Sequence, residues 1–255
     1  MPTATRNAEA PRAPMDPLRK VALIAGGLYL LTFLAGIPPA LSLYNDVLSN
    51  PEFILGSGSG TAIVWGGLLE IVNAIACIGT AVVLFPVLKR QSEAAALGFV
   101  TARVIEAGVI ILGVISLLSI VTLRQDIATT AGAEAASLVA LGHALVAVHQ
   151  WTALIGPGLV PAFNALLLGY VLYRSGLVPR VIPAMALVGG PLLLASFVAA
   201  LLGGSEQVSG VWGIAVIPIF FWELSLGLYM TFKGFKPSPI TSSSLPSTPA
   251  PLPLS

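Results

Sequence analysis

Residues 94–123 read AAALGFVTARVIEAGVIILGVISLLSIVTL. A helix rises about 1.5 Å per residue, so this stretch is long enough to cross the ~30 Å hydrocarbon core of a bilayer. Its first half carries two ionisable side chains, Arg103 and Glu106. Each costs roughly 2.5–3.5 kcal/mol at mid-membrane on insertion scales, so such residues usually face a protein interior. The stretch therefore predicts a membrane helix with one functional polar face.

The rest of the chain is apolar in the same way. Of its 255 residues, 56% are hydrophobic and 9% are charged, whereas about a quarter are charged in a typical soluble domain. The lipid bilayer is therefore the predicted surrounding of most of the surface. The net charge of +1 comes without a basic cluster that could bind nucleic acid, so we expect no nucleic-acid partner.

Six runs meet the ~20-residue length of a spanning helix. They are Val21–Leu43, Thr61–Leu84, Ala94–Leu123, Trp151–Tyr173, Val181–Leu202 and Val211–Phe232. Residues 133–150 are also apolar, and we expect an amphipathic helix on the outer surface that bends into the fourth span near Pro157. The predicted fold is an all-α, polytopic membrane helix bundle of six transmembrane helices, with this outer-surface helix before the fourth.

Charge outside the spans is uneven. One side carries Arg6, Arg12, Arg19, Lys20, Lys89, Arg90, Arg174, Arg180, Lys233 and Lys236, and the other carries Asp46, Glu52, Asp126, Glu134 and Glu206 with Arg124. Because cytoplasmic loops are enriched in Lys and Arg, both termini are predicted to be cytoplasmic. We expect residues 1–19 and the Pro/Ser-rich residues 237–255 to be disordered cytoplasmic tails around a membrane domain of residues 20–236.

Four ionisable residues are predicted to lie at one depth. Counting helical rise from the span ends places Glu70, Arg103, Glu106 and Glu223 within about 5 Å of the membrane midplane. Arg103 and Glu106 are three residues apart, so they share a helix face and can pair. The sequence thus predicts a polar centre shared by three helices.

Two amides extend this predicted centre. Asn73 lies one turn from Glu70 on the same face, and Asn164 lies at a comparable depth in the fourth span. If Arg103 neutralises one carboxylate, burial favours a protonated form of at least one other, which could bind or shuttle a proton. The alternative is a structural network in which the ion pair and hydrogen-bonded acids only fix the helix register.

Metal and cofactor sites are not expected. His143 and His149 are six residues apart, about 120° around a helix, unlike the i, i+4 pair that grips zinc. His149 could instead accept a proton at the outer mouth or be a satisfied interfacial histidine. Cys77, the only cysteine, is expected to be a packing residue. No GxxxxGK[ST] motif is present, so no nucleotide is expected.

Several segments carry a resemblance to a known family. They are AGGLYLLTFLAGIP (Ala25–Pro38), LLEIVNA (Leu68–Ala74), VLFPVLKRQ (Val83–Gln91), RVIEAG (Arg103–Gly108), HQW (His149–Trp151), VLYRSGLVPR (Val171–Arg180) and WELSLGLYMTFKGFK (Trp222–Lys236). In this order they resemble the bacterial multi-pass membrane proteins grouped as domain of unknown function 4386. The resemblance implies a six-span protein of the bacterial cell (inner) membrane, without an established activity.

Three functions fit these observations. The first is binding or transport of a small or lipid-like ligand at the polar centre, with coupling to protons; six spans are few for a transporter, so a homodimer would suit it. The second is an intramembrane acid/base enzyme acting on a lipid or isoprenoid, with Glu70 or Glu223 as the acid. The third is a regulatory or scaffold subunit whose charges are purely structural. The first is our leading hypothesis, with ligand- or proton-binding candidates Glu70, Asn73, Arg103, Glu106, His149, Asn164 and Glu223.

Overall fold

The computed structural model describes residues 15–50, 52–56, 60–129, 135–203 and 205–242. These residues form helices only, in agreement with the predicted all-α class. The helices are α1 (Pro17–Pro38), a π-helical turn η1 (Pro39–Leu43), α2 (Asn45–Ser49), a 3₁₀ turn η2 (Phe53–Leu55), α3 (Thr61–Leu88), α4 (Glu93–Thr129), α5 (Ala135–Ser175), α6 (Val181–Gly203), α7 (Ser205–Phe232) and α8 (Pro239–Ser242). Six of them are long and apolar enough to cross a membrane, which confirms the predicted six-span bundle.

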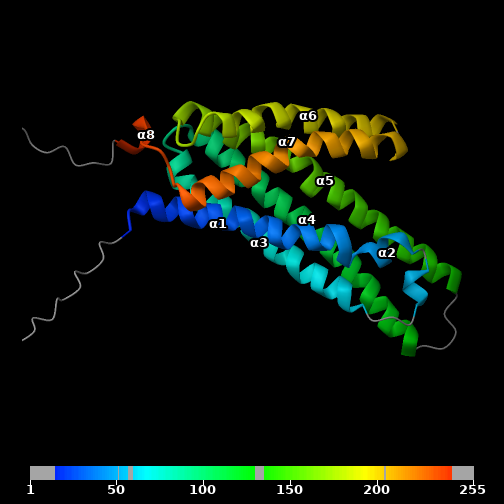
Figure 1. The fold of residues 1–255 in the computed structure, drawn as a ribbon. Helices are drawn as coiled ribbons and strands as arrows, with labels where there is room; N and C mark the ends of the chain where they lie inside the picture. The colour runs from blue at the N-terminus through cyan, green and yellow to red at the C-terminus, as the bar shows by residue number, and fades with distance from the viewer. Residues whose placement is uncertain (1–14, 51, 57–59, 130–134, 204, 243–255) are drawn as a thin grey trace, which may run out of the picture.

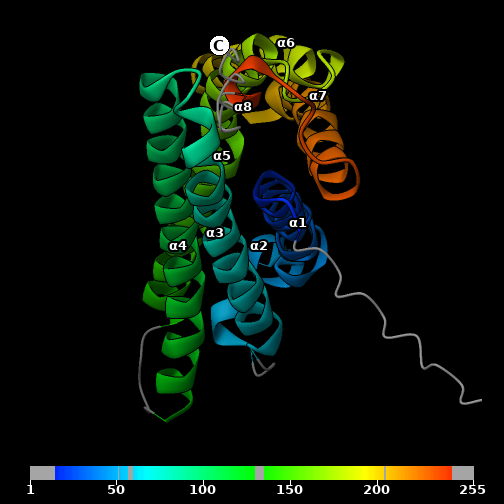
Figure 2. The same cartoon turned by 90° about the vertical axis from the view of Figure 1, so that its left-hand side faces the viewer.

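The six long helices form a closed ring. Each of α1, α3, α4, α5, α6 and α7 packs against its neighbours in this order, and α1 also packs against α7. Figures 1 and 2 show this arrangement, in which the first and last spans lie beside each other. Because every spanning helix has a partner on both sides, apolar residues that face the ring build a large core, which includes Tyr29, Leu84, Phe99, Leu168 and Trp222.

The expected surface helix before the fourth span is not a separate element. Residues 135–150 are the first part of α5, a single helix of 41 residues that runs through Pro157 and Pro161 (Figure 1). Prolines are tolerated within membrane helices because neighbouring helices can satisfy the freed backbone groups. The apolar side chains of this first part, including Leu138 and Leu145, pack against a second core built around Tyr44 and Ile54. These side chains therefore have a protein partner, whereas Leu141 and Val148 of the same stretch are exposed.

A close crossing joins α1 to α7. A Cβ atom added to Gly26 would lie 2.6 Å from the Thr231 backbone nitrogen and 2.7 Å from the Gly227 carbonyl oxygen. Only glycine allows the two backbones to approach in this way. Further along, the rings of Phe33 and Phe220 meet edge to face with centroids 5.2 Å apart.

Arg19 fastens the same two helices at one end of the bundle. Its Nη1 donates to the Met230 carbonyl oxygen at 2.9 Å, and its Nη2 donates to the Thr231 carbonyl oxygen at 2.7 Å. The last carbonyls of a helix have no partner within the helix and carry partial negative charge, so a guanidinium stabilises them. Arg19 therefore closes the ring at the end of α7.

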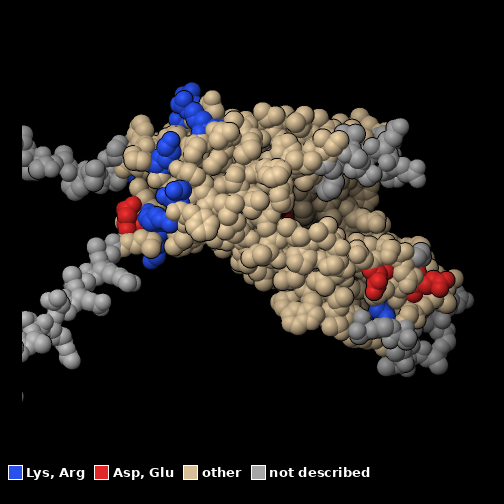
Figure 3. Space-filling model, viewed as in Figure 1, with Lys and Arg blue, Asp and Glu red and all other residues tan. Residues whose placement is uncertain are grey.

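Charged side chains separate to the two ends of the molecule. Lys and Arg gather at the end where α1 begins and α7 ends, which we call the basic end, and acidic groups gather at the opposite end (Figure 3). Asp46 and Glu52 belong to the opposite end, while Glu134 and the side chains of Asp126 and Glu206 lie outside the described part of the chain. The long middle section shows very few charged atoms, as a membrane-embedded surface should.

The predicted tails fall largely outside the described residues, so their disorder stays a prediction. Helical structure extends a few residues past both predicted edges of the membrane domain, because α1 begins at Pro17 and α8 follows Pro237. Ser238 ties this C-terminal segment to the bundle by donating its hydroxyl to the Ser175 carbonyl oxygen at 2.5 Å.

Candidate functional site

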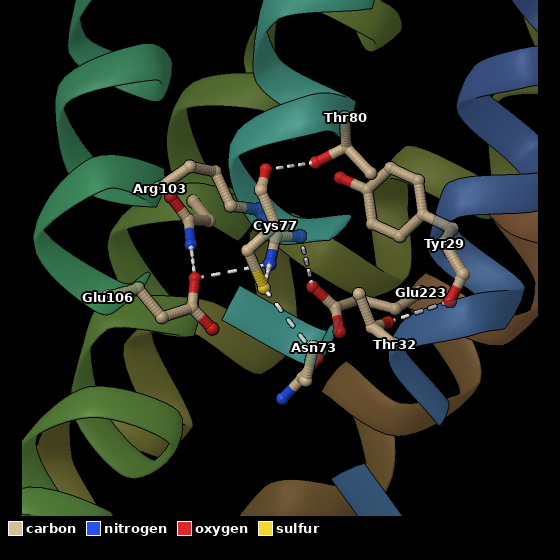
Figure 4. A network of polar contacts seen from close by, with 9 residues as sticks. Tyr29, Thr32, Asn73, Cys77, Thr80, Arg103, Glu106 and Glu223 are labelled. Atoms are coloured by element: carbon tan, nitrogen blue, oxygen red, sulfur yellow. Dashed lines mark hydrogen bonds and ion pairs between the residues drawn. The ribbon is translucent and has the colours of Figure 1, made fainter. Parts of the chain in front are cut away.

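Arg103 lies in the interior of the ring and joins two helices. Its side chain is 2% exposed, with Nη1 3.1 Å from Glu106 Oε2 on α4 and Nη2 2.7 Å from Glu223 Oε1 on α7 (Figure 4). The first pair is the i, i+3 pair that the sequence predicts. The second links residues 120 positions apart, so it fixes α4 against α7 on opposite sides of the ring.

Asn164 brings a third helix to this centre. Its Nδ2 donates to Glu106 Oε2 at 2.7 Å from α5. Glu106 therefore accepts hydrogen bonds from a guanidinium and an amide on the same oxygen. We call Arg103, Glu106, Asn164 and Glu223 the Arg103 cluster.

Soft and aromatic groups complete the surroundings of the guanidinium. Arg103 Nη1 donates to Cys77 Sγ on α3 at 3.6 Å, and Arg103 Cζ lies 5.1 Å from the ring centre of Tyr29 and 5.7 Å from that of Phe99. Aromatic faces attract cations, most strongly where water is absent. Cys77 is buried, as expected of a packing residue, and also contacts the charged centre.

Two polar atoms of the Arg103 cluster make no hydrogen bond to any described residue. They are Arg103 Nε and Asn164 Oδ1, and both are buried. An unpaired buried polar atom costs roughly 1–3 kcal/mol. Few buried polar atoms in folded proteins lack a partner, and those that do are often explained by a bound water or ion, by strain or by a part in chemistry.

A cavity of about 180 Å³ adjoins the Arg103 cluster. Its polar lining residues are Thr32, Asn73, Cys77, Arg103, Glu106 and Glu223, and its other lining residues are Phe33, Gly36, Ile37, Pro157, Pro161 and Phe220. Five of the six spanning helices contribute to these walls. Figure 3 shows a hollow between α7 and α1, with acidic atoms visible at its base.

The cavity meets an excess of negative charge. One guanidinium, Arg103, faces two carboxylates, Glu106 and Glu223, so the formal charge is +1 − 2 = −1 when both acids are ionised. A net charge in a membrane interior is costly. With both acids ionised, one added positive charge, a proton or a cation, would make this centre neutral.

Glu70 lies apart from this centre, so the expectation of one centre that includes it is wrong. Its Oε2 accepts a hydrogen bond at 2.9 Å from the hydroxyl of Tyr44, which follows η1. Cys77 contacts Arg103, and Glu70 precedes Cys77 by seven residues, or about 10 Å along α3. The register of α3 against α4, rather than depth counted from span ends, decides which side chains meet.

His149 belongs to the same neighbourhood as Glu70. Its ring meets that of Tyr44 edge to face with centroids 5.2 Å apart, and its Nδ1 lies 3.3 Å from the Gly113 carbonyl oxygen on α4. A carbonyl only accepts, so this contact is a hydrogen bond when Nδ1 carries a proton. His149 is buried, and its predicted role as a proton acceptor at the outer mouth stays a prediction. We call Tyr44, Glu70 and His149 the Tyr44 cluster.

Asn73 stands between the two clusters. It lines the cavity beside the Arg103 cluster, and its Oδ1 lies 3.9 Å from Cys77 Sγ. Of the seven predicted residues, four form the Arg103 cluster, Asn73 adjoins it, and Glu70 and His149 form a second group with Tyr44. Within the described residues, no three His, Cys, Asp or Glu side chains are grouped so as to hold a metal ion.

Sequence reasoning missed two tyrosines. Tyr29 packs beside the guanidinium, and nothing in its apolar surroundings in sequence marks it. Tyr44 turns back from η1 against α3, where a Cβ atom on Gly66 would lie only 2.8 Å from its Cζ. The Gly66-Gly67 pair, one turn before Glu70, is the signal that could have indicated a ring packed at this position.

The fold and the buried charges define the chain as a multi-pass α-helical membrane protein with an intramembrane polar centre. The chain belongs to the family described as domain of unknown function (DUF4386), whose model matches residues 24–234. Both clusters lie within the matched region. No curated protein and no solved structure matches the chain.

Proposed function

We propose that this protein binds a small amphiphilic ligand in the cavity beside the Arg103 cluster and carries it across the membrane. The observation that supports this most is the mixed lining of the cavity. Charged, amide and hydroxyl groups line it together with aromatic and aliphatic groups. Ligand pockets typically combine mostly apolar walls with a few placed polar groups.

The size of the cavity suits part of a ligand. Pockets for whole drug-sized ligands measure about 300–1,000 Å³, and this cavity measures about 180 Å³. A polar head of a few atoms would occupy this cavity, while an apolar body would extend along Phe33, Ile37 and Phe220, which line the same cavity. Figure 3 shows the hollow between α1 and α7, and Arg19 joins these two helices at the basic end, which suits a carrier whose helices rock about a fixed site.

The alternative functions have less support. An acid/base enzyme with Glu70 and Glu223 as its acid and base would need both carboxyls at one substrate, but Glu70 belongs to the Tyr44 cluster and does not line the cavity. A purely structural network would be packed without space beside it, because interiors are close-packed. The cavity beside the charges therefore favours binding.

We also propose that the basic end faces the cytoplasm, which would make both termini cytoplasmic in a bacterial inner membrane. Support comes from Lys20, Lys89, Arg90, Arg174 and Lys233, which all lie toward that end. Lys and Arg are enriched on the cytoplasmic side of membrane proteins. Accessibility of tags at both termini in sealed spheroplasts would test this orientation.

A binding experiment with three matched probes tests the function. The probes share a dansyl group and a five-carbon chain and end in an ammonium, a hydroxyl or a carboxylate. We expect at least one to bind the purified protein saturably, above empty micelles. The Gly36→Phe variant should lower that affinity about tenfold or more, because the new ring would fill the cavity that Gly36 lines.

The control is Gly27→Phe on the same helix. A Cβ atom on Gly27 would meet nothing within 4 Å, so this ring would point away from the cavity and leave binding unchanged. Absence of binding by all three probes, or equal binding by wild type and Gly36→Phe, would overturn the proposed function.

A further inference from the structure

We propose that the ligand is a monovalent organic cation, an amine or quaternary ammonium with an apolar body, which binds against Glu223 in place of a proton. This inference rests on the proposed function and names the ligand class. It follows from which charges in the cavity are already paired and which remain open.

The guanidinium that lines the cavity is already occupied. Arg103 Nη1 is held by Glu106, and Nη2 is held by Glu223 at 2.7 Å. An anionic ligand would have to displace one of these carboxylates and would raise the excess negative charge from −1 to −2. The Arg103 cluster therefore selects against anions.

Glu223 is the carboxylate that a ligand can reach. Its side chain is 16% exposed, against 6% for Glu106 and 2% for Arg103. Its Oε1 accepts from Arg103, and its Oε2 accepts no hydrogen bond from the described residues. One carboxylate oxygen is thus available to a cation on the cavity side.

Among the described residues, the surroundings of Glu223 contain no second cation. From α4 it faces Arg103 and Glu106, from α1 Tyr29 and Thr32, from α3 Asn73 and Cys77, and from α5 Asn164. Helix α6, which also packs on α7, has no titratable side chain. Neutrality of this centre therefore requires one added proton or one added cation.

Aromatic rings favour an organic cation over a metal ion. Phe33 and Phe220 line the cavity together with Glu223, and their rings meet edge to face. Ammonium groups are attracted to aromatic faces, and the contact gains strength when the groups are removed from water. Ile37, Pro157 and Pro161 give the carbon body an apolar surface.

Binding of the cation then exchanges it for a proton of the Arg103 cluster. The Arg103 cluster releases the one proton that balances its charge, the carboxylate of Glu223 pairs with the cation, and no covalent bond to the ligand forms. Charge in the site is the same before and after. A carrier that works in this way moves one cation against one proton.

The experiment uses the three dansyl probes and adds a trimethylammonium probe whose charge is independent of pH. We expect both cationic probes to bind about tenfold or more tightly than the hydroxyl probe. In weakly buffered solution, binding of the trimethylammonium probe should release one proton per site. Its affinity should rise with pH, by up to about tenfold per unit, while the Arg103 cluster of the free protein holds one proton.

Two variants test whether Glu223 is the carboxylate that pairs with the cation. Glu223→Gln keeps Arg103 paired with Glu106 at zero net charge, and it should lose both the preference for cations and the proton release. Glu70→Gln removes a different intramembrane acid, outside the cavity, and should keep both. Proton release by wild type can be measured even if a variant does not fold.

The outcomes distinguish the two proposals. Equal or tighter binding of the hydroxyl or carboxylate probe, still sensitive to Gly36→Phe, would overturn the cation inference and leave the proposed function standing. Cation binding without proton release would overturn the exchange. Absence of binding by every probe would overturn both.

Discussion

The Arg103 cluster and the Tyr44 cluster both bury ionisable groups between membrane helices, but different interactions hold them. In the first, a guanidinium joins carboxylates on α4 and α7 and an amide on α5 supports them. In the second, Glu70 accepts a hydrogen bond from a neutral hydroxyl. The first cluster lies beside a cavity that five helices line. Ion pairing therefore fixes the helices around the cavity, whereas hydrogen bonding and ring packing hold the Tyr44 cluster.

The largest loss of stability should come from removing the guanidinium of Arg103. Arg103→Met leaves Glu106 and Glu223 buried without a counter-charge, so we expect a loss of about 3–5 kcal/mol in the free energy of unfolding. Unfolding in mixed micelles measures this quantity. Glu70→Gln is the matched change in the Tyr44 cluster and should cost far less. Similar losses in both variants would remove the distinction between the clusters.

A steric change should break the Tyr44 cluster alone. A side chain at Gly66 would overlap the Tyr44 ring, whose Cζ lies 2.8 Å from the Cβ position. We expect Gly66→Val to cost about 1–3 kcal/mol of unfolding free energy. Binding in the cavity should persist in this variant, since the Arg103 cluster is untouched. Loss of binding at unchanged stability would show that the two clusters are coupled.

A smaller loss of stability is expected when the amide of Asn164 is removed. Its amide donates to Glu106, and a hydrogen bond to a charged group between membrane helices contributes about 1.5 kcal/mol at the upper end of measured values. Asn164→Ala should lower stability by this amount. Asn164→Asp, which replaces the donor with a third acid, should lower it further. A stable Asn164→Asp variant would contradict the negative charge balance assigned to the cavity.

The smallest effect concerns the tyrosine hydroxyl. Tyr44→Phe keeps the ring against His149 and Gly66 but removes the hydrogen bond to Glu70. Interhelical hydrogen bonds in membranes average about 0.6 kcal/mol, so the change in unfolding free energy should be near that value. Tyr44→Ala, which also removes the ring, should cost several times more. Equal costs would mean that ring packing contributes nothing.

The sequence was sufficient for the fold class because span length and apolar composition are local properties. The i, i+3 pair of Arg103 and Glu106 is also local, and it is present. Counting helical rise from the span ends placed Glu223 and Asn164 at the depth of this pair, and in the structure Glu223 contacts Arg103 and Asn164 contacts Glu106.

The rest depends on how helices pack, which no single segment encodes. Glu70 was placed with Arg103 because both depths were counted from predicted span ends, but the contact of Cys77 with Arg103 sets the actual register. Residues 135–150 continue α5 because Tyr44 and Ile54 offer them a packing surface. That surface exists only after the chain turns back at η1.

The most direct test of the central claim is a double-mutant cycle between Arg103 and Glu223. Unfolding free energies would be measured for wild type, Arg103→Met, Glu223→Gln and the double variant. The two residues pair across the ring in our account, so the double variant should be more stable than additivity predicts by at least about 1.5 kcal/mol, because it buries one unpaired acid fewer than Arg103→Met. Additive effects, within about 0.5 kcal/mol, would contradict the pairing of α4 with α7 and the cavity built on it.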